Sequence, residues 1–163
     1  MKKTLLALAL IGASATASAD SWIYGSASVG QADLGGDSST SYNAHVGTGI
    51  LPIIGLEAGY QNFGDFDNIT YGNYTGQLEG SAVYFAVKPS LDFGPLHVYA
   101  KGGLHSYELT GSNFKEDEID MMYGVGVEYF VAGPLSLGAS YNVFNMKEDD
   151  VKNLSFNATL HFL

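Results

Sequence analysis

Apolar and polar residues alternate along most of the chain beyond residue 20, with a period of two residues. In segment 42–50, Tyr42, Ala44, Val46, Thr48 and Ile50 share one face, opposite Asn43, His45, Gly47 and Gly49. Seven further segments repeat the pattern, with the more apolar faces Ile23, Gly25, Ala27, Val29; Ile54, Leu56, Ala58, Tyr60; Val83, Phe85, Val87; Leu96, Val98, Ala100, Gly102, Leu104; Met121, Tyr123, Val125, Val127, Tyr129; Leu135, Leu137, Ala139, Tyr141, Val143; and Leu154, Phe156, Ala158, Leu160, Phe162. No residue on these faces is charged, and the pattern predicts eight β-strands.

The opposite faces of these segments are polar but carry few charges. They hold small residues and Tyr, together with Glu57, Lys88, Lys101, Glu128, His45, His97, His105 and His161. A water-soluble sheet would show a face rich in Lys, Glu and Thr. Small side chains with a few charges instead fit a narrow polar interior enclosed by an apolar, lipid-facing wall. We therefore predict an all-β fold, an eight-stranded antiparallel transmembrane up-and-down β-barrel.

The connections between the predicted strands alternate in length. Three are short and contain proline, at 51–53, 93–96 and 132–135. Four are longer and polar, at 31–41, 64–80, 108–120 and 145–153. Outer-membrane barrels have short periplasmic turns and longer extracellular loops, so the two sets are expected at opposite ends of the barrel.

Aromatic residues gather near the predicted strand ends. They are Trp22, Phe93, Phe130 and Phe162 toward the short turns, and Tyr60, Phe63, Tyr107, Tyr141 and Phe144 toward the long loops. Aromatic girdles mark the two membrane interfaces of such barrels, so these side chains are expected on the outer surface.

The first 19 residues have the layout of a secretory signal peptide. Two lysines precede an apolar run from Leu5 to Ile11, and Ala17-Ser18-Ala19 offers a cleavage site. The run is shorter than the roughly 20 residues a membrane-spanning helix needs. We expect residues 1–19 to be removed and residues 20–163 to form the outer-membrane barrel domain. Cysteine is absent, so disulfides cannot stabilise this exported domain.

The expected mature chain is strongly acidic. It keeps five lysines, no arginine and all 17 acidic residues, a formal charge of −12. Nucleic acid is excluded as a partner because binding a polyanion requires a basic surface.

Several segments resemble the OmpA/OmpX type of small outer-membrane barrel. They are Trp22-Ile23-Tyr24-Gly25, Gly55-Leu56-Glu57-Ala58-Gly59-Tyr60, Ala100-Lys101 and Gly126-Val127-Glu128-Tyr129, and their order and spacing together carry the likeness. The chain end is similar to the assembly signal of that family, with Leu154, Phe156, Ala158, Leu160 and Phe162 in alternation, although Leu163 stands beyond the aromatic residue. The resemblance implies a monomer in the outer membrane of a Gram-negative cell. The partners it implies are outer-membrane lipid and lipopolysaccharide, periplasmic chaperones, the barrel-assembly machinery and a possible host surface ligand.

The predicted interior places Glu57, Lys88, Lys101 and Glu128 on consecutive strands, in the charge order −, +, +, −. A structural network is favoured over a gate or ion path, because side chains fill an eight-stranded barrel and a buried charge needs a partner. The inward histidines lack ligand-type partners at close spacing, so no metal or other cofactor is expected.

Two kinds of segment contain residues of catalytic or metal-binding type. His105-Ser106 could suggest a lipid A-modifying hydrolase, but neighbouring residues in a strand face opposite sides, which separates base from nucleophile. The acidic runs 115–120 and 147–150 could hold Ca²⁺ or Mg²⁺ beside lipopolysaccharide phosphates, yet they lack EF-hand spacing and solvation alone explains them.

The sequence therefore predicts a non-enzymatic surface protein, acting in adhesion, host interaction or envelope integrity through acidic loops. A heparin-type adhesin would be expected to have basic loops. The main alternative is a narrow pore for small solutes, and a lipid A-modifying enzyme is the third class.

Overall fold

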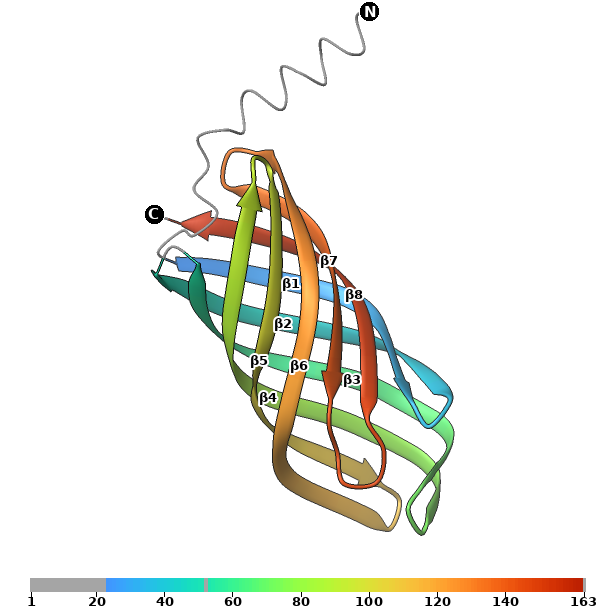
Figure 1. The fold of residues 1–163 in the computed structure, drawn as a ribbon. Coiled ribbons are helices and arrows are strands. Elements are labelled where there is room, and N and C mark those ends of the chain that lie inside the picture. The colour runs from blue at the N-terminus through green and yellow to red at the C-terminus, as the bar shows by residue number, and fades with distance from the viewer. Residues whose placement is uncertain (1–22, 52, 163) are drawn as a thin grey trace, which may run out of the picture.

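The chain forms a closed antiparallel barrel in which each strand pairs with its neighbours in sequence and β1 pairs with β8 (Figure 1). The computed structural model describes residues 23–51 and 53–162. The strands are β1 Ile23–Leu34, β2 Asp37–Leu51, β3 Ile54–Tyr71, β4 Tyr74–Phe93, β5 Leu96–Gly111, β6 Phe114–Ala132, β7 Leu135–Phe144 and β8 Val151–Phe162. The predicted fold class is confirmed. The predicted signal peptide, Trp22 and Leu163 lie outside the described residues.

An apolar belt surrounds the barrel. The large side chains of the predicted apolar faces point outward, with Val46 61%, Phe85 54%, Val125 58% and Phe156 70% exposed. An apolar surface of this extent is typical of a wall in contact with lipid. Val143 is an exception to the predicted faces, because it is only 7% exposed. Within residues 23–51 and 53–162, no helix is long and apolar enough to cross a membrane.

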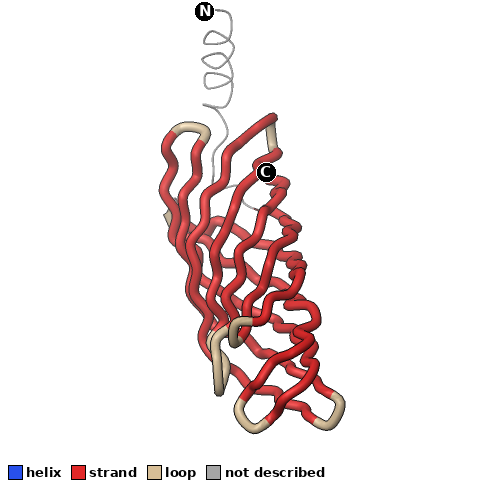
Figure 2. Tube along the Cα trace, turned by 90° about the vertical axis from the view of Figure 1, so that its right-hand side faces the viewer, coloured by secondary structure: helices blue, strands red, loops and turns tan. Residues whose placement is uncertain are grey.

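Three of the four predicted long loops are wrong. Residues 31–41, 64–80 and 108–120 are mostly paired strand, and they end in two-residue turns at 35–36, 72–73 and 112–113. Gly35, Gly36 and Gly72 supply the positive φ angles (60°, 89° and 56°) that two of these turns require. In the fourth predicted loop, 145–153, residues 145–150 lie outside regular strand, so the observed loop is shorter than the predicted one. Figure 2 shows strand continuing almost to these tips. We call this part of the barrel, built around residues 31–41, 64–80, 108–120 and 145–153, the hairpin end.

An apolar cluster fills the interior of the hairpin end and reaches into the belt, where Tyr84 and Ala86 lie beside Glu57. The predicted polar inner faces included its Ala and Tyr residues but not its larger aliphatic side chains and Phe. We call this cluster the hairpin core: Ala32, Leu34, Phe63, Phe66, Ile69, Tyr71, Leu78, Ala82, Tyr84, Ala86, Tyr107, Leu109, Met122, Phe144, Met146 and Val151. The rings of Phe63 and Phe144 meet edge to face, with centroids 5.0 Å apart. Beyond the belt the alternation therefore inverts, with apolar residues inside and polar residues outside.

This inversion corrects part of the predicted aromatic girdles. Phe63 is 0% exposed and Tyr107 and Phe144 are 1% exposed, so all three belong to the hairpin core. Phe130, at the opposite end, is also buried, at 4%. The remaining described girdle residues, Tyr60, Phe93, Tyr141 and Phe162, lie on the outer surface as predicted. Whether an aromatic side chain faces inward or outward is set by its position in the alternation along the strand, and not by its distance from the strand end.

The hairpin core predicts a local stability effect. Leu109 is fully buried, so Leu109→Ala should cost about 2–5 kcal/mol by leaving a cavity. Amide hydrogen exchange of β3 to β6 at the hairpin end should accelerate accordingly. Thr110→Ala is the matched control, because Thr110 is the exposed neighbour on the same strand. Exchange in Leu109→Ala that matches the control would contradict a packed core.

Candidate functional site

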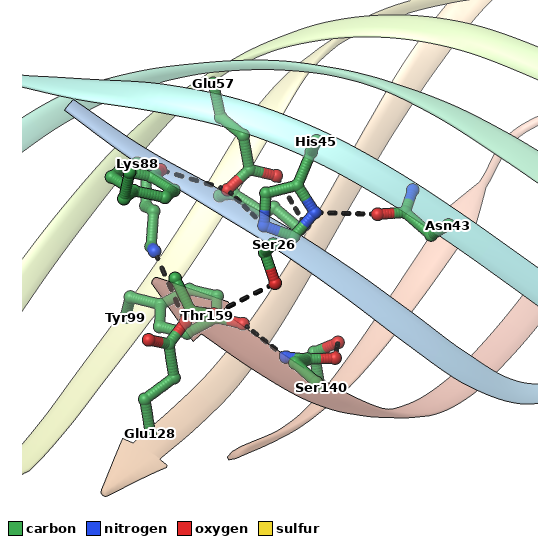
Figure 3. A network of polar contacts seen from close by, with 12 residues as sticks. Ser26, Asn43, His45, Glu57, Lys88, Tyr99, Glu128, Ser140 and Thr159 are labelled. Atoms are coloured by element: carbon green, nitrogen blue, oxygen red, sulfur yellow. Dashed lines mark hydrogen bonds and ion pairs between the residues drawn. The ribbon is translucent and has the colours of Figure 1, made fainter. Parts of the chain in front are cut away.

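Four charged side chains on successive strands enter the barrel within the belt. They are Glu57 on β3, Lys88 on β4, Lys101 on β5 and Glu128 on β6, and their exposures are 1%, 4%, 6% and 1%. Alternation turns each inward, because the strand residues on either side of each lie on the outer face. Figure 3 shows Glu57, Lys88 and Glu128 converging on the space inside the barrel.

The Glu57 carboxylate is held by four side chains. Lys101 Nζ lies 2.8 Å from Oε1, and the Tyr84 hydroxyl donates to the same oxygen at 2.8 Å. The Tyr24 hydroxyl donates to Oε2 at 3.1 Å, and His45 Nε2 lies 3.5 Å from that oxygen. Charge-assisted hydrogen bonds of this number offset much of the cost of burying a carboxylate.

The Glu128 carboxylate forms a second cluster. Lys88 Nζ lies 3.6 Å from Oε1, and Ser136 Oγ donates to Oε2 at 2.8 Å, with His161 Nε2 3.6 Å from the same oxygen. The Lys88 ammonium also lies over two tyrosine rings, 4.5 Å from the Tyr24 centroid and 4.1 Å from that of Tyr99. The ion pairs therefore join β3 to β5 and β4 to β6, and each skips one strand.

Three tyrosines make this packing possible, and the sequence analysis did not single them out. Tyr24, Tyr84 and Tyr99 point inward, and each is paired in register with a glycine: Gly47, Gly59 and Gly126. A Cβ at any of these glycines would overlap the tyrosine ring, so the ring lies flat over the opposite backbone. Inward Tyr facing cross-strand Gly is the sequence signal that could have identified them.

The inward histidines are dispersed. His45 Nδ1 lies 2.7 Å from Asn43 Oδ1, His97 Nδ1 2.6 Å from Asp92 Oδ1, and His105 Nε2 2.8 Å from the Asn145 carbonyl oxygen. In the described part of the chain, no group of three His, Asp or Glu side chains could hold a metal ion.

Two serine–histidine pairs are close, one in sequence and one in space. Ser106 is exposed on the outer face whereas His105 is 1% exposed inside, so the two are separated by the barrel wall. Ser136, His161 and Glu128 do meet, but Ser136 Oγ and Glu128 Oε2 both approach His161 Nε2, at 3.0 and 3.6 Å. A catalytic triad needs serine and acid on different ring nitrogens. Ser136 is also 0% exposed, which denies a substrate access.

The predicted assembly residues form one stripe. Leu154, Phe156, Ala158, Leu160 and Phe162 all face outward on β8. Their role in recognition by the assembly machinery remains a prediction.

A closed barrel with an apolar belt and a paired, buried charge network defines a membrane-spanning β-barrel protein. The chain belongs to the outer membrane protein beta-barrel domain family, whose model matches residues 4–162, and it is therefore located in the cell outer membrane. The predicted likeness to OmpA/OmpX-type barrels and the predicted location are both confirmed.

Solved structures share this fold at low sequence identity. The N-terminal barrel domain of Pseudomonas aeruginosa OprF is 12% identical, with a TM-score of 0.58 over 85% of this chain and 97% of that one. Yersinia pestis Ail, in complex with the heparin analogue sucrose octasulfate, is 13% identical, with a TM-score of 0.54 over 88% and 98%. The outer membrane enzyme PagL is 12% identical, with a TM-score of 0.51 over 85% and 99%. No curated protein matches the chain significantly in sequence.

The charge network predicts an asymmetric mutational response. Glu57→Gln should lower the free energy of unfolding by about 3–5 kcal/mol, because it leaves Lys101 buried without its carboxylate. Adding Lys101→Met should recover part of that loss, since the unpaired charge is then removed. Urea unfolding in lipid vesicles measures the free energy of unfolding of both variants. Glu79→Gln on the exposed face of β4 is the control, and equal stability of Glu57→Gln and this control would rule out the proposed pairing.

Proposed function

We propose that the protein is a non-enzymatic and non-conducting surface protein of the outer membrane, whose specificity lies at the hairpin end. The observation that carries this proposal is that the interior is filled at two successive levels. Glu57 and Glu128 are each 1% exposed within the belt, and Phe63, Phe66 and Leu109 are 0% exposed beyond it. A path for solutes would need room at both levels.

The orientation follows from general barrel architecture. Most turns at both ends are short, but only at one end do the hairpins continue well beyond the apolar belt. Outer-membrane barrels have their longer connections outside the cell, so we place the hairpin end there. Thirteen acidic residues lie at that end: Asp33, Asp37, Asp65, Asp67, Glu79, Glu108, Glu116, Asp117, Glu118, Asp120, Glu148, Asp149 and Asp150. The lysines there are Lys115, Lys147 and Lys152. This balance favours a cationic partner and disfavours a sulfated sugar such as the analogue bound to Ail.

Hydrogen bonds between segments hold the hairpin end together, which suits recognition by a preorganised surface. The hydroxyls of Tyr71 and Tyr107 both donate to Glu116 Oε1 at 3.0 Å, and they accept from the backbone amides of Glu148 and Lys147. Burial raises the pKa of Tyr107 to about 12, and burial likewise raises the pKa of Tyr71. Both hydroxyls therefore keep their protons at physiological pH and join β3, β5, β6 and the 145–150 loop.

The absence of enzymatic activity is proposed from geometry. Although PagL shows that an enzyme can have this fold, Ser106 and His105 are on opposite sides of the wall here. Ser136, His161 and Glu128 are buried inside the barrel. Neither arrangement offers a nucleophile and base to a lipid or peptide substrate.

Planar bilayer recordings test the filled interior. The refolded protein should give no steady single-channel steps, because charged and apolar side chains fill successive levels of the barrel. Steady steps that vanish in Lys101→Ala or Glu128→Ala would place conduction through the charge network and reject the non-conducting function.

Cell-binding measurements test the surface role. Gram-negative cells displaying the protein should adhere to host cells better than cells without it, and Asp117→Asn/Glu118→Gln/Asp120→Asn should reduce this difference several-fold. The control Thr40→Ala/Thr75→Ala/Thr110→Ala changes exposed, uncharged residues of the same end. Adhesion that is equal with and without the protein would reject the surface role, and an equal loss in both variants would reject its dependence on charge.

A further inference from the structure

A cavity of about 320 Å³ lies at the hairpin end, between the β3–β4 turn, the β5–β6 turn and the 145–150 loop. Figure 1 shows the tips of these hairpins side by side. Aromatic and acidic side chains line it, among them Tyr71, Tyr74, Phe114, Glu116 and Glu148. Its size falls within the range of small-molecule sites.

The aromatic wall is held in place by its own contacts. The rings of Tyr74 and Phe114 are 5.2 Å apart, and those of Tyr71 and Phe114 are 6.1 Å apart at 68°. The Tyr74 hydroxyl donates to the Gln77 carbonyl oxygen at 3.0 Å and accepts from the Ser112 amide at 3.2 Å. Tyr74 thus joins two hairpins, and the rings need little rearrangement to receive a ligand.

The acidic groups of the cavity leave acceptor capacity unused. Glu116 Oε1 accepts from two tyrosine hydroxyls, whereas Oε2 has an ion pair with Lys147 Nζ at 3.9 Å, a distance too long for a hydrogen bond. The Glu148 side chain is exposed and lies against Gly72 of the β3–β4 turn. Two carboxylates therefore line a space that also presents aromatic rings.

We propose that this cavity binds an organic cation, a primary ammonium group on an apolar stem such as a lysine side chain. Aromatic faces attract a cation and its stem, and carboxylates beside them accept the hydrogen bonds of the ammonium. A sulfated or phosphorylated ligand would be repelled by the two carboxylates and by the acidic surroundings.

This inference deepens the proposed function by naming the chemistry of a ligand, and it rests on that function only for the exposure of the hairpin end to the medium. The two can fail separately. Conductance and cell adhesion test the surface role, whereas titration of the purified protein tests the cavity.

The experiment is an NMR titration of the full mature protein with Nα-acetyl-lysine N-methylamide, and the isosteric norleucine derivative serves as the neutral probe. A polyoxyethylene detergent is suitable, because its headgroup is neither a sugar nor an ammonium. The amide signals of residues 71–74 and 112–116 should shift with the lysine probe and respond little to the norleucine probe. Binding of the lysine probe should weaken at high salt.

Three variants complete the test. Glu148→Gln and Phe114→Ala should each weaken binding about fivefold, because one removes a charge and the other an aromatic face. Glu79→Gln removes the same charge on the outer face of β4, away from the cavity, and should change affinity less than twofold. The proposal is overturned if the lysine probe causes no shift, if both probes bind equally, or if Glu148→Gln and Glu79→Gln weaken binding equally.

Discussion

The structure depends on one constraint, which is that backbone polar groups in contact with hydrocarbon must find partners within the protein. Pairing of β1 with β8 meets it by removing the sheet edges. Closure with eight strands then leaves an interior narrow enough for side chains to fill. Charges placed there cannot be hydrated by bulk water, so Glu57 and Glu128 depend on Lys101 and Lys88, on hydroxyls and on tyrosine rings stacked over glycine backbone. The polar packing of the belt therefore follows from closure.

The two tiers of the interior reflect two solvents outside the wall. Around the belt the solvent is lipid, so apolar side chains lose nothing by facing outward, and the interior can be polar. Around the hairpin end the solvent is water, so burial of Phe66, Ile69 and Leu109 is favoured as in a soluble protein. The alternation inverts between the tiers, and register shifts between Asn62 and Gly64 and between Phe66 and Ile69 lie near the transition in β3.

The same inversion explains which parts of the fold were predictable from sequence. Strand number, the apolar belt and the inward orientation of Glu57, Lys88, Lys101 and Glu128 followed from alternation alone. Segments such as 64–80 were predicted as loops because their outward residues are polar and glycine-rich, although Phe66, Ile69 and Leu78 keep an inward apolar face. To predict the pairing of Glu57 with Lys101, one must know how β3 and β5 are offset along the barrel, and the pattern within a single strand does not contain that offset. Tyrosine was ambiguous as well, since it suits both an interface and a crowded interior.

The division of the barrel into tiers also separates stability from recognition. Residues that close and fill the barrel face inward or toward lipid, and neither set can contact a partner in the medium. What remains accessible is the outer face and the tips of the hairpin end, where Tyr74 and Glu116 link neighbouring hairpins while leaving ring faces and a carboxylate oxygen available. Because sequence identity with the three solved barrels described above is only 12–13%, their ligands do not transfer to this chain. Its ligand chemistry has to be derived from the side chains at its own tips, and these combine aromatic rings with negative charge.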